Sequence, residues 1–151
     1  MIRDKGNMFG LVDQGANRAL LVTTNSYIRR DGALVMGRGA ALTAAKRWPR
    51  LPYELGQRIE HLGEYNVGLL SQTNEPRLSI GAFQVKFNFA DAADLDLIAR
   101  SANELAKLAT ERHDWRFDMN YPGIGNGRLS LTTVNPLLES LPDNVHIWTF
   151  T

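Results

Sequence analysis

Short apolar segments alternate along the chain with segments of helical periodicity, and this alternation restricts the fold more than any other feature. The segments that we interpret as strands are 19–24, 65–71, 78–85, 116–121 and 145–150. Several of them are apolar throughout, which is typical of central strands covered on both faces. The alternation predicts the α/β class, and specifically a three-layer α/β/α sandwich with a mixed central sheet.

Helical patterns fill the intervals between these strands. The predicted helices span 38–48, 51–63, 91–109 and 133–141. The pattern is clearest in 91–109, where apolar residues from Leu95 to Ala109 share one face and Asp91 is placed to cap the start. Pro49 is expected to end the first helix and Gly63 the second.

Composition and charge limit the classes of function. The chain has 151 residues, of which 44% are hydrophobic, so we expect a single domain over 1–151. A formal net charge of +1 indicates neither a nucleic-acid nor a membrane partner, and the absence of cysteine excludes disulfides and thiolate sites. The first ten residues lack the apolar core of a signal peptide, so a cytoplasmic location is expected.

Two glycine-bearing loops follow predicted strands. One spans 25–41 and contains Gly37-Arg38-Gly39 just before a helix, and the other, 120–129, has three glycines on alternate positions. Such glycines mark either turns or places where backbone approaches a ligand. Glycines at a helix start let N–H groups reach a phosphate, so two facing loops of this kind could hold a diphosphate. Neither loop has the spacing of a Walker or dinucleotide-binding motif.

The order of these motifs resembles that of a macro domain, the ADP-ribose-binding module, over essentially the whole chain. The segments that carry the resemblance are KGNMF (5–9, as opening strand), LLVTTNS (20–26), VMGRGAALTAAKRWP (35–49), FQVKFNF (83–89), YPGIGNGRL (121–129) and VHIWTF (145–150). Bacterial and phage macro domains of the DarG type are the most similar subgroup, and the animal terminal ADP-ribose protein glycohydrolase is more distant. The resemblance implies ADP-ribose, or ADP-ribosylated DNA or protein, as partner, together with a cognate ADP-ribosyltransferase toxin.

The same resemblance implies which residues contact the ligand. They are Asn7, Met8, Thr24, Asn25, Met36, Gly37, Arg38, Gly39, Pro122, Gly123, Ile124, Gly125, Asn126, Gly127 and Arg128. Asn25 is expected at the distal ribose, although its position after a strand also suits an Asx turn. Asn7 is expected near the adenine, or is a turn residue. Arg38 either adds charge to the diphosphate loop or lies on a solvated helix start.

Lys86 is the candidate that would make the protein an enzyme. The resemblance implies that it acts at the anomeric carbon of the distal ribose, with Asn25 as the second catalytic residue. Without the resemblance, a lysine at a strand end is an ordinary surface charge. The sequence departs from the family pattern at Phe87-Asn88-Phe89 and lacks an aspartate in the second phosphate loop.

These observations favour an ADP-ribosyl hydrolase of the DarG kind. The alternatives are a non-catalytic ADP-ribose reader, a phosphatase of ADP-ribose 1″-phosphate and, outside the family, a generic nucleotide-binding domain. His61, His113 and His146 have no metal-binding spacing, so neither metal nor cofactor is expected. Phe87 and Phe89 are expected to make apolar core contacts, and the alternative is that one of them flanks the distal ribose or the adenine.

Overall fold

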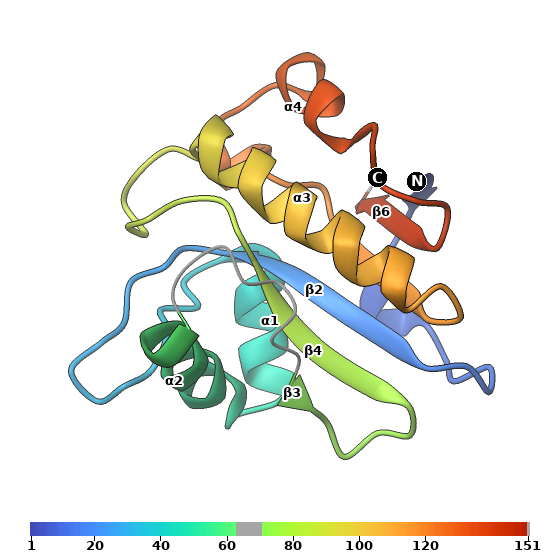
Figure 1. Ribbon diagram of the computed structural model, residues 1–151. Coiled ribbons are helices and arrows are strands. Elements are labelled where there is room, and N and C mark those ends of the chain that lie inside the picture. Colours follow the sequence, from blue (N-terminus) through green and yellow to red (C-terminus); the bar gives the residue numbers. More distant parts are fainter. Residues whose placement is uncertain (63–70, 151) are drawn as a thin grey trace.

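The computed structural model describes residues 1–62 and 71–150 (Figure 1). In chain order the elements are β1 (Ile2–Lys5), the 3-10 helix η1 (Met8–Gly10), β2 (Arg18–Thr24), α1 (Gly39–Arg47), α2 (Leu51–Leu62), β3 (Ser71–Gln72), β4 (Leu78–Gln84), α3 (Leu95–Glu111), β5 (Arg116–Asn120), the 3-10 helix η2 (Gly125–Gly127), α4 (Leu131–Leu138) and β6 (Val145–Thr149). None of the helices in the described part of the chain is both long and apolar enough to span a membrane.

The sheet consists of parallel strands with one short antiparallel strand at its edge. The strand order is β1-β6-β5-β2-β4-β3, and every neighbouring pair is parallel except β3 with β4. The prediction of a mixed central sheet is therefore wrong, because the antiparallel pairing is confined to two residues at the edge. The physical reason is the connections: α3 and α4 each carry the chain back across the sheet before the next strand begins, and such crossovers produce parallel neighbours.

Apolar side chains point alternately to the two faces of the sheet and build a core on each. Leu21 and Phe117 belong to the core beneath α3 and α4. Leu20 and Val22, the residues on either side of Leu21 in β2, point to the other face of the sheet and belong to the core with α1 and α2. In Figure 1, α3 and α4 lie above the sheet and α1 and α2 below it. The molecule thus has the predicted three layers.

Two predicted element boundaries change because of local hydrogen bonds and turns. Helix α3 begins at Leu95 because Asp94, and not Asp91, accepts the capping hydrogen bond from Leu97 N–H at 3.1 Å. The segment 5–9 is not a strand, because β1 already ends at Lys5 and the chain then turns at a glycine with φ of 120°.

The predicted strand 65–71 falls almost entirely outside the described residues. Only Ser71 belongs to the described chain, where it begins β3. Gly63, the predicted end of the second helix, also lies outside the described residues, and α2 is described up to Leu62.

Candidate functional site

The carboxyl ends of the parallel strands form one edge of the sheet, and the crossovers change face between β2 and β5. The loop after β2 leads to α1 on one face, whereas the loop after β5 leads to α4 on the other. The two strands also separate there. Asn120 spans the gap: its Oδ1 accepts from Thr23 N–H at 3.0 Å, and its Nδ2 donates to Thr23 Oγ1 at 2.7 Å. Ligands of open α/β sheets bind at such switch points.

Asn25 follows β2 directly and folds the next loop onto itself. The residue is buried; its Oδ1 accepts from Tyr27 N–H at 2.9 Å, and its Nδ2 donates to Val35 O at 3.0 Å. The first of these bonds is the Asx turn that the sequence offered as an alternative. An amide carries two N–H groups, so one remains for a ligand. Asn25 therefore has a structural task independent of any ribose.

Residues 37–39 present exposed backbone at the start of α1. Arg38 is the N-cap residue, and its side chain makes no capping hydrogen bond. The first N–H groups of the helix thus lack a side-chain partner at the cap. Gly39 has a φ of 62°, which favours glycine, and a Cβ there would lie 3.7 Å from Asn126 Nδ2. The two glycine-bearing loops therefore meet at the switch point.

The glycines of the second loop serve three different purposes. Gly123 has a φ of 78°, and a Cβ there would lie 2.8 Å from Ile98 Cδ1, so this glycine is required by packing. Gly127 has no positive φ, but a Cβ there would lie only 3.0 Å from Ala93 Cβ. Gly125 has a φ of 64° with nothing within 4 Å of a Cβ. Among the three, Gly125 is the one that faces open space.

Two arginines, one from each glycine-bearing loop, lie within electrostatic reach of Lys86. Burial lowers the pKa of the Lys86 ammonium, the charge of Arg128 lowers it further, Asp91 raises it, and Arg38 again lowers it. Arg38 and Arg128, which come from two other loops, are thus close enough to influence the charge of Lys86. Lys86 Nζ donates to Phe89 O at 3.2 Å and to Asp91 O at 3.3 Å.

The three loops are linked by hydrogen bonds. Ser26 Oγ donates to Lys86 O at 3.2 Å, and Arg128 Nη2 donates to Ala90 O at 3.1 Å. Arg128 itself has a φ of 64°, which is unusual for a residue other than glycine. Lys86 and Arg128 are therefore held by a connected framework of hydrogen bonds. Such preorganised positive charge is what an anionic ligand requires.

Comparison with known proteins decides the fold family. Neither a protein-family model nor a curated protein sequence matches the chain. Among solved structures, the macrodomain of Mycobacterium tuberculosis DarG aligns with a TM-score of 0.71 at 21% identity, covering 98% of this chain and 99% of that one. The macrodomain of Thermus aquaticus DarG gives 0.71 at 20% identity, covering 99% and 97%.

This chain has the macrodomain fold. A third structure, Thermosipho africanus DarTG in complex with ADP-ribose, aligns with a TM-score of 0.66 at 18% identity, covering 86% of this chain and 37% of that longer chain.

Several of the predicted ligand residues are packed inside the protein. Met8 is fully buried and Met36 nearly so, both in the core with α1 and α2. Pro122 is buried, and Ile124 packs against the opposite core. Asn7 is exposed, and its Oδ1 accepts from Phe9 N–H at 3.0 Å to cap η1. These side chains shape the loops, and the ligand-accessible atoms nearby are mainly backbone and cationic groups.

Two hydroxyl groups lie buried at the carboxyl edge of this macrodomain. Thr24 is the last residue of β2, and Tyr121 directly follows β5. Neither Thr24 Oγ1 nor Tyr121 OH has a hydrogen-bond partner among the described residues. Burial raises the pKa of the Tyr121 phenol, against a smaller opposing effect of Arg3. Each such group costs about 1–3 kcal/mol of stability. Tyr121 was not among the predicted site residues, because no sequence pattern marks a buried hydroxyl.

Aromatic side chains at the site correct one prediction. Phe87 and Phe89 were expected in the core, yet they are 41% and 51% exposed. Phe89 instead packs edge-on against Tyr27, with ring centroids 5.5 Å apart. The reason is that β4 ends at Gln84, so both phenylalanines lie in the loop beyond the sheet. The macrodomain therefore carries an exposed aromatic rim beside Lys86.

One charged cluster was not visible in the sequence. His146 Nδ1 lies 2.7 Å from Asp4 Oδ2, and the buried Asp118 lies close to both. Arg116 donates to both oxygens of Asp118, and Trp148 Nε1 donates to it at 2.8 Å. Because an arginine and an indole already satisfy the buried carboxylate, this cluster is a hydrogen-bonded network that joins β1, β6 and β5.

Proposed function

We propose that this macrodomain binds ADP-ribose across the switch point between β2 and β5. Two observations carry the proposal: Lys86 and Arg128 donate to the carbonyl oxygens of the adjacent residues Phe89 and Ala90, and the charges of Arg128 and Arg38 both lower the pKa of Lys86. A diphosphate carries two negative charges, so it matches this group of cations together with the backbone N–H groups at the start of α1. The Thermosipho africanus relative in complex with ADP-ribose supports the same ligand.

Within this proposal the backbone contributes most of the phosphate contacts. Residues 37–39 and 123–127 hold the diphosphate through N–H groups, and Gly125 is the position where the ligand approaches most closely. Asn25 contacts the distal ribose with its remaining amide N–H while its Asx turn holds the loop in place. Arg38 and Arg128 add positive charge from either side.

We further propose that the macrodomain removes ADP-ribose from modified DNA or protein. Lys86 acts at the anomeric carbon of the distal ribose, where the bond to the modified group breaks and a water oxygen takes its place. The proton released by water passes to the departing group. An amine can act as nucleophile or base only in its neutral form, and the lowered pKa of Lys86 increases that fraction.

The alternative function is a reader that binds ADP-ribose without turnover. Two observations favour it: Lys86 Nζ already donates to two backbone carbonyl oxygens, and residues 122–128 contain no carboxylate. The amide of Asn126 cannot replace a carboxylate as a base. Binding and hydrolysis must therefore be measured separately.

ADP-ribose is expected to raise the melting temperature of the protein, whereas AMP will have a much smaller effect. A ligand that binds only the folded state at a hundred times its Kd stabilises it by about 2.7 kcal/mol, which for a chain of this size corresponds to roughly 5 °C or more. A thermal melt at saturating ligand makes the measurement. An unchanged melting curve would disprove ADP-ribose binding.

Replacing Arg128 with glutamine should shift the pH dependence of hydrolysis to higher pH. Activity rises as pH increases through the pKa of Lys86, because only the neutral amine reacts. Arg128 lowers that pKa, so its removal raises the pKa and moves the rising limb toward alkaline pH. The profile of kcat/KM reports the free enzyme and is the quantity to measure.

Lys107→Gln is the matched control for this experiment, since Lys107 is an exposed lysine of α3 whose side chain is 72% accessible. This variant should keep the wild-type profile. If Arg128→Gln lowers activity equally at every pH, Lys86 is not the titrating group.

A further inference from the structure

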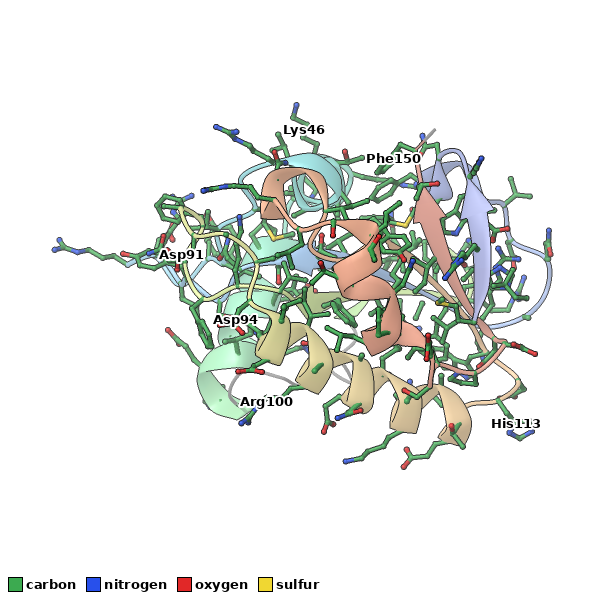
Figure 2. All side chains as sticks on the ribbon, turned by 90° about the horizontal axis from the view of Figure 1, so that it is seen from above. Lys46, Asp91, Asp94, Arg100, His113 and Phe150 are labelled. Carbon is green, nitrogen blue, oxygen red and sulfur yellow. The ribbon has the colours of Figure 1, made fainter. Side chains whose placement is uncertain are left out.

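A cavity lies at the amino ends of β2, β4 and β5, the edge of the sheet opposite to the candidate site. Its volume is about 440 Å³, and its polar lining includes Asn17, Arg58, Gln72, Arg77 and Arg112, with Trp115 beside them. Figure 2 labels His113, the neighbour of Arg112 in sequence, at the far end of α3 from Asp94. The length of that helix therefore separates the cavity from Lys86.

The arginines of this cavity are not equally compensated. Arg77 forms two contacts with the carboxylate of Asp13, and this pairing, helped by Arg18, holds the pKa of Asp13 below its ordinary value. In contrast, the guanidinium groups of Arg58 and Arg112 form no hydrogen bond or ion pair with the residues that the structure describes. Asp13 is thus the one carboxylate paired with an arginine of this cavity, and the charges of Arg58 and Arg112 are not paired with any carboxylate among the described residues.

A further guanidinium nitrogen lies close to this lining. Arg18 begins β2, directly after Asn17, and pairs in register with Leu78, which also lines the cavity. The side chain is 7% exposed, and its Nε has no hydrogen-bond partner within the described chain. A buried guanidinium nitrogen without a hydrogen-bond partner favours a nearby anionic acceptor, because little water is present to satisfy it.

Arg112 is held in place by aromatic stacking. Its guanidinium carbon lies 4.7 Å from the ring centroid of Trp115, whose ring stacks in turn with Phe117 at 6.2 Å and 24°. Stacking fixes the plane of the guanidinium and leaves its N–H edge available. Such an edge matches two oxygens of a phosphate, and the fixed geometry reduces the entropy lost on binding.

We propose that this cavity is a second anion site that takes a phosphate or diphosphate group. The group could belong to a free nucleotide or to a nucleic-acid backbone, and both present the same oxygens to Arg58 and Arg112. Because the cavity lies at the opposite edge of the sheet, this proposal does not depend on ADP-ribose binding. The arginines that line the cavity make it locally basic although the net charge of the whole chain is only +1.

Inorganic pyrophosphate is the probe, and the indole N–H signal of Trp115 in a ¹H–¹⁵N spectrum is the local reporter. The chain has three tryptophans, so the signal can be assigned with a Trp115→Phe variant. Pyrophosphate should shift the Trp115 signal in a saturable manner. Arg58→Gln and Arg112→Gln should each weaken this binding about tenfold, the effect of losing one charge-assisted contact.

Lys46→Gln is the matched control, because it removes the same charge from the exposed end of α1 (Figure 2). It should leave the pyrophosphate affinity unchanged. Arg112→Lys keeps the positive charge but loses the planar guanidinium, so this variant should also bind pyrophosphate more weakly. A melting temperature equal to that of the wild type would show that the variant still folds without the stack of Arg112 on Trp115.

A single-stranded oligonucleotide distinguishes the two sources of phosphate. If it competes with pyrophosphate at Trp115, and its affinity falls steeply with salt, the site takes a nucleic-acid backbone. If it leaves the Trp115 signal unchanged while pyrophosphate binds, the site takes a small phosphate. A Trp115 signal that responds to neither probe, or a pyrophosphate affinity that is equal in wild type and both glutamine variants, would overturn the proposal.

Discussion

Replacing Lys86 with alanine will reduce hydrolysis of an ADP-ribosylated substrate by about a hundredfold or more, the usual loss when a general acid or base is removed. ADP-ribose binding will persist, because the loop backbones, Arg38 and Arg128 supply most of the affinity. The two quantities are measured as single-turnover release of ADP-ribose from modified DNA or protein and as calorimetric affinity. We expect the Lys86→Ala variant to lose the release of ADP-ribose and to keep its affinity for ADP-ribose.

A second substitution decides what Lys86 does. Arginine in its place keeps the positive charge and can still donate hydrogen bonds, but it does not deprotonate at any usable pH. Lys86→Arg should therefore be as inactive as Lys86→Ala if a neutral amine is required, and partly active if charge alone suffices. Lys107→Ala, on the exposed face of α3, is the control and should behave as wild type.

Two outcomes would contradict the proposed chemistry. Hydrolysis that survives Lys86→Ala would remove Lys86 from the mechanism. Tight binding of ADP-ribose by a wild type that is inactive on every linkage would make the protein a reader. Asn25→Ala is expected to weaken binding and hydrolysis together, since Asn25 also holds the loop after β2 through its bonds to Tyr27 and Val35.

Replacing Gly125 with valine will lower ADP-ribose affinity by about a hundredfold, equivalent to two charge-assisted hydrogen bonds. The φ of 64° at Gly125 is strongly unfavourable for a β-branched residue, so the loop must change conformation and its N–H groups leave the phosphate. The protein will still fold, because no atom lies within 4 Å of the added Cβ. Calorimetry and a thermal melt test both parts.

Gly15→Val is a matched control for Gly125→Val. Gly15 also has a positive φ, 88°, and open space around a Cβ, but it lies in the loop between η1 and β2. Its replacement should cost similar stability and leave ADP-ribose affinity unchanged. If Gly125→Val binds as well as wild type, this glycine is only a turn residue.

Gly125→Asn separates backbone strain from close approach, since asparagine tolerates a positive φ. If the ligand lies against this position, asparagine will also weaken binding; if only the backbone angle matters, it will bind normally. Gly127→Val is less informative. A Cβ at Gly127 would lie only 3.0 Å from Ala93 Cβ, in the loop before α3. Reduced binding by Gly127→Val could therefore result from this disturbed contact and not from the loss of a ligand contact.

The secondary structure followed largely from local patterns, and its errors have identifiable causes. Strands such as 78–85 and helix 91–109 were predicted because hydrophobic periodicity is a property of neighbouring residues. The start of α3 was misplaced because Asp94, and not Asp91, accepts the capping hydrogen bond from Leu97 N–H. The prediction of a mixed sheet was wrong because strands that pair are distant in sequence. No local sequence pattern indicates whether two neighbouring strands run parallel.

The sequence by itself determined the alternation of strands and helices, the two glycine-bearing loops, and the resemblance to macro domains. Only the tertiary structure decided that Arg38 and Arg128 lie within electrostatic reach of Lys86, that Phe87 and Phe89 are exposed, and that arginines meet in a cavity at the opposite edge. The physical reason is that backbone propensity and periodicity act over a few residues, whereas charges act through space between loops that the sheet brings together.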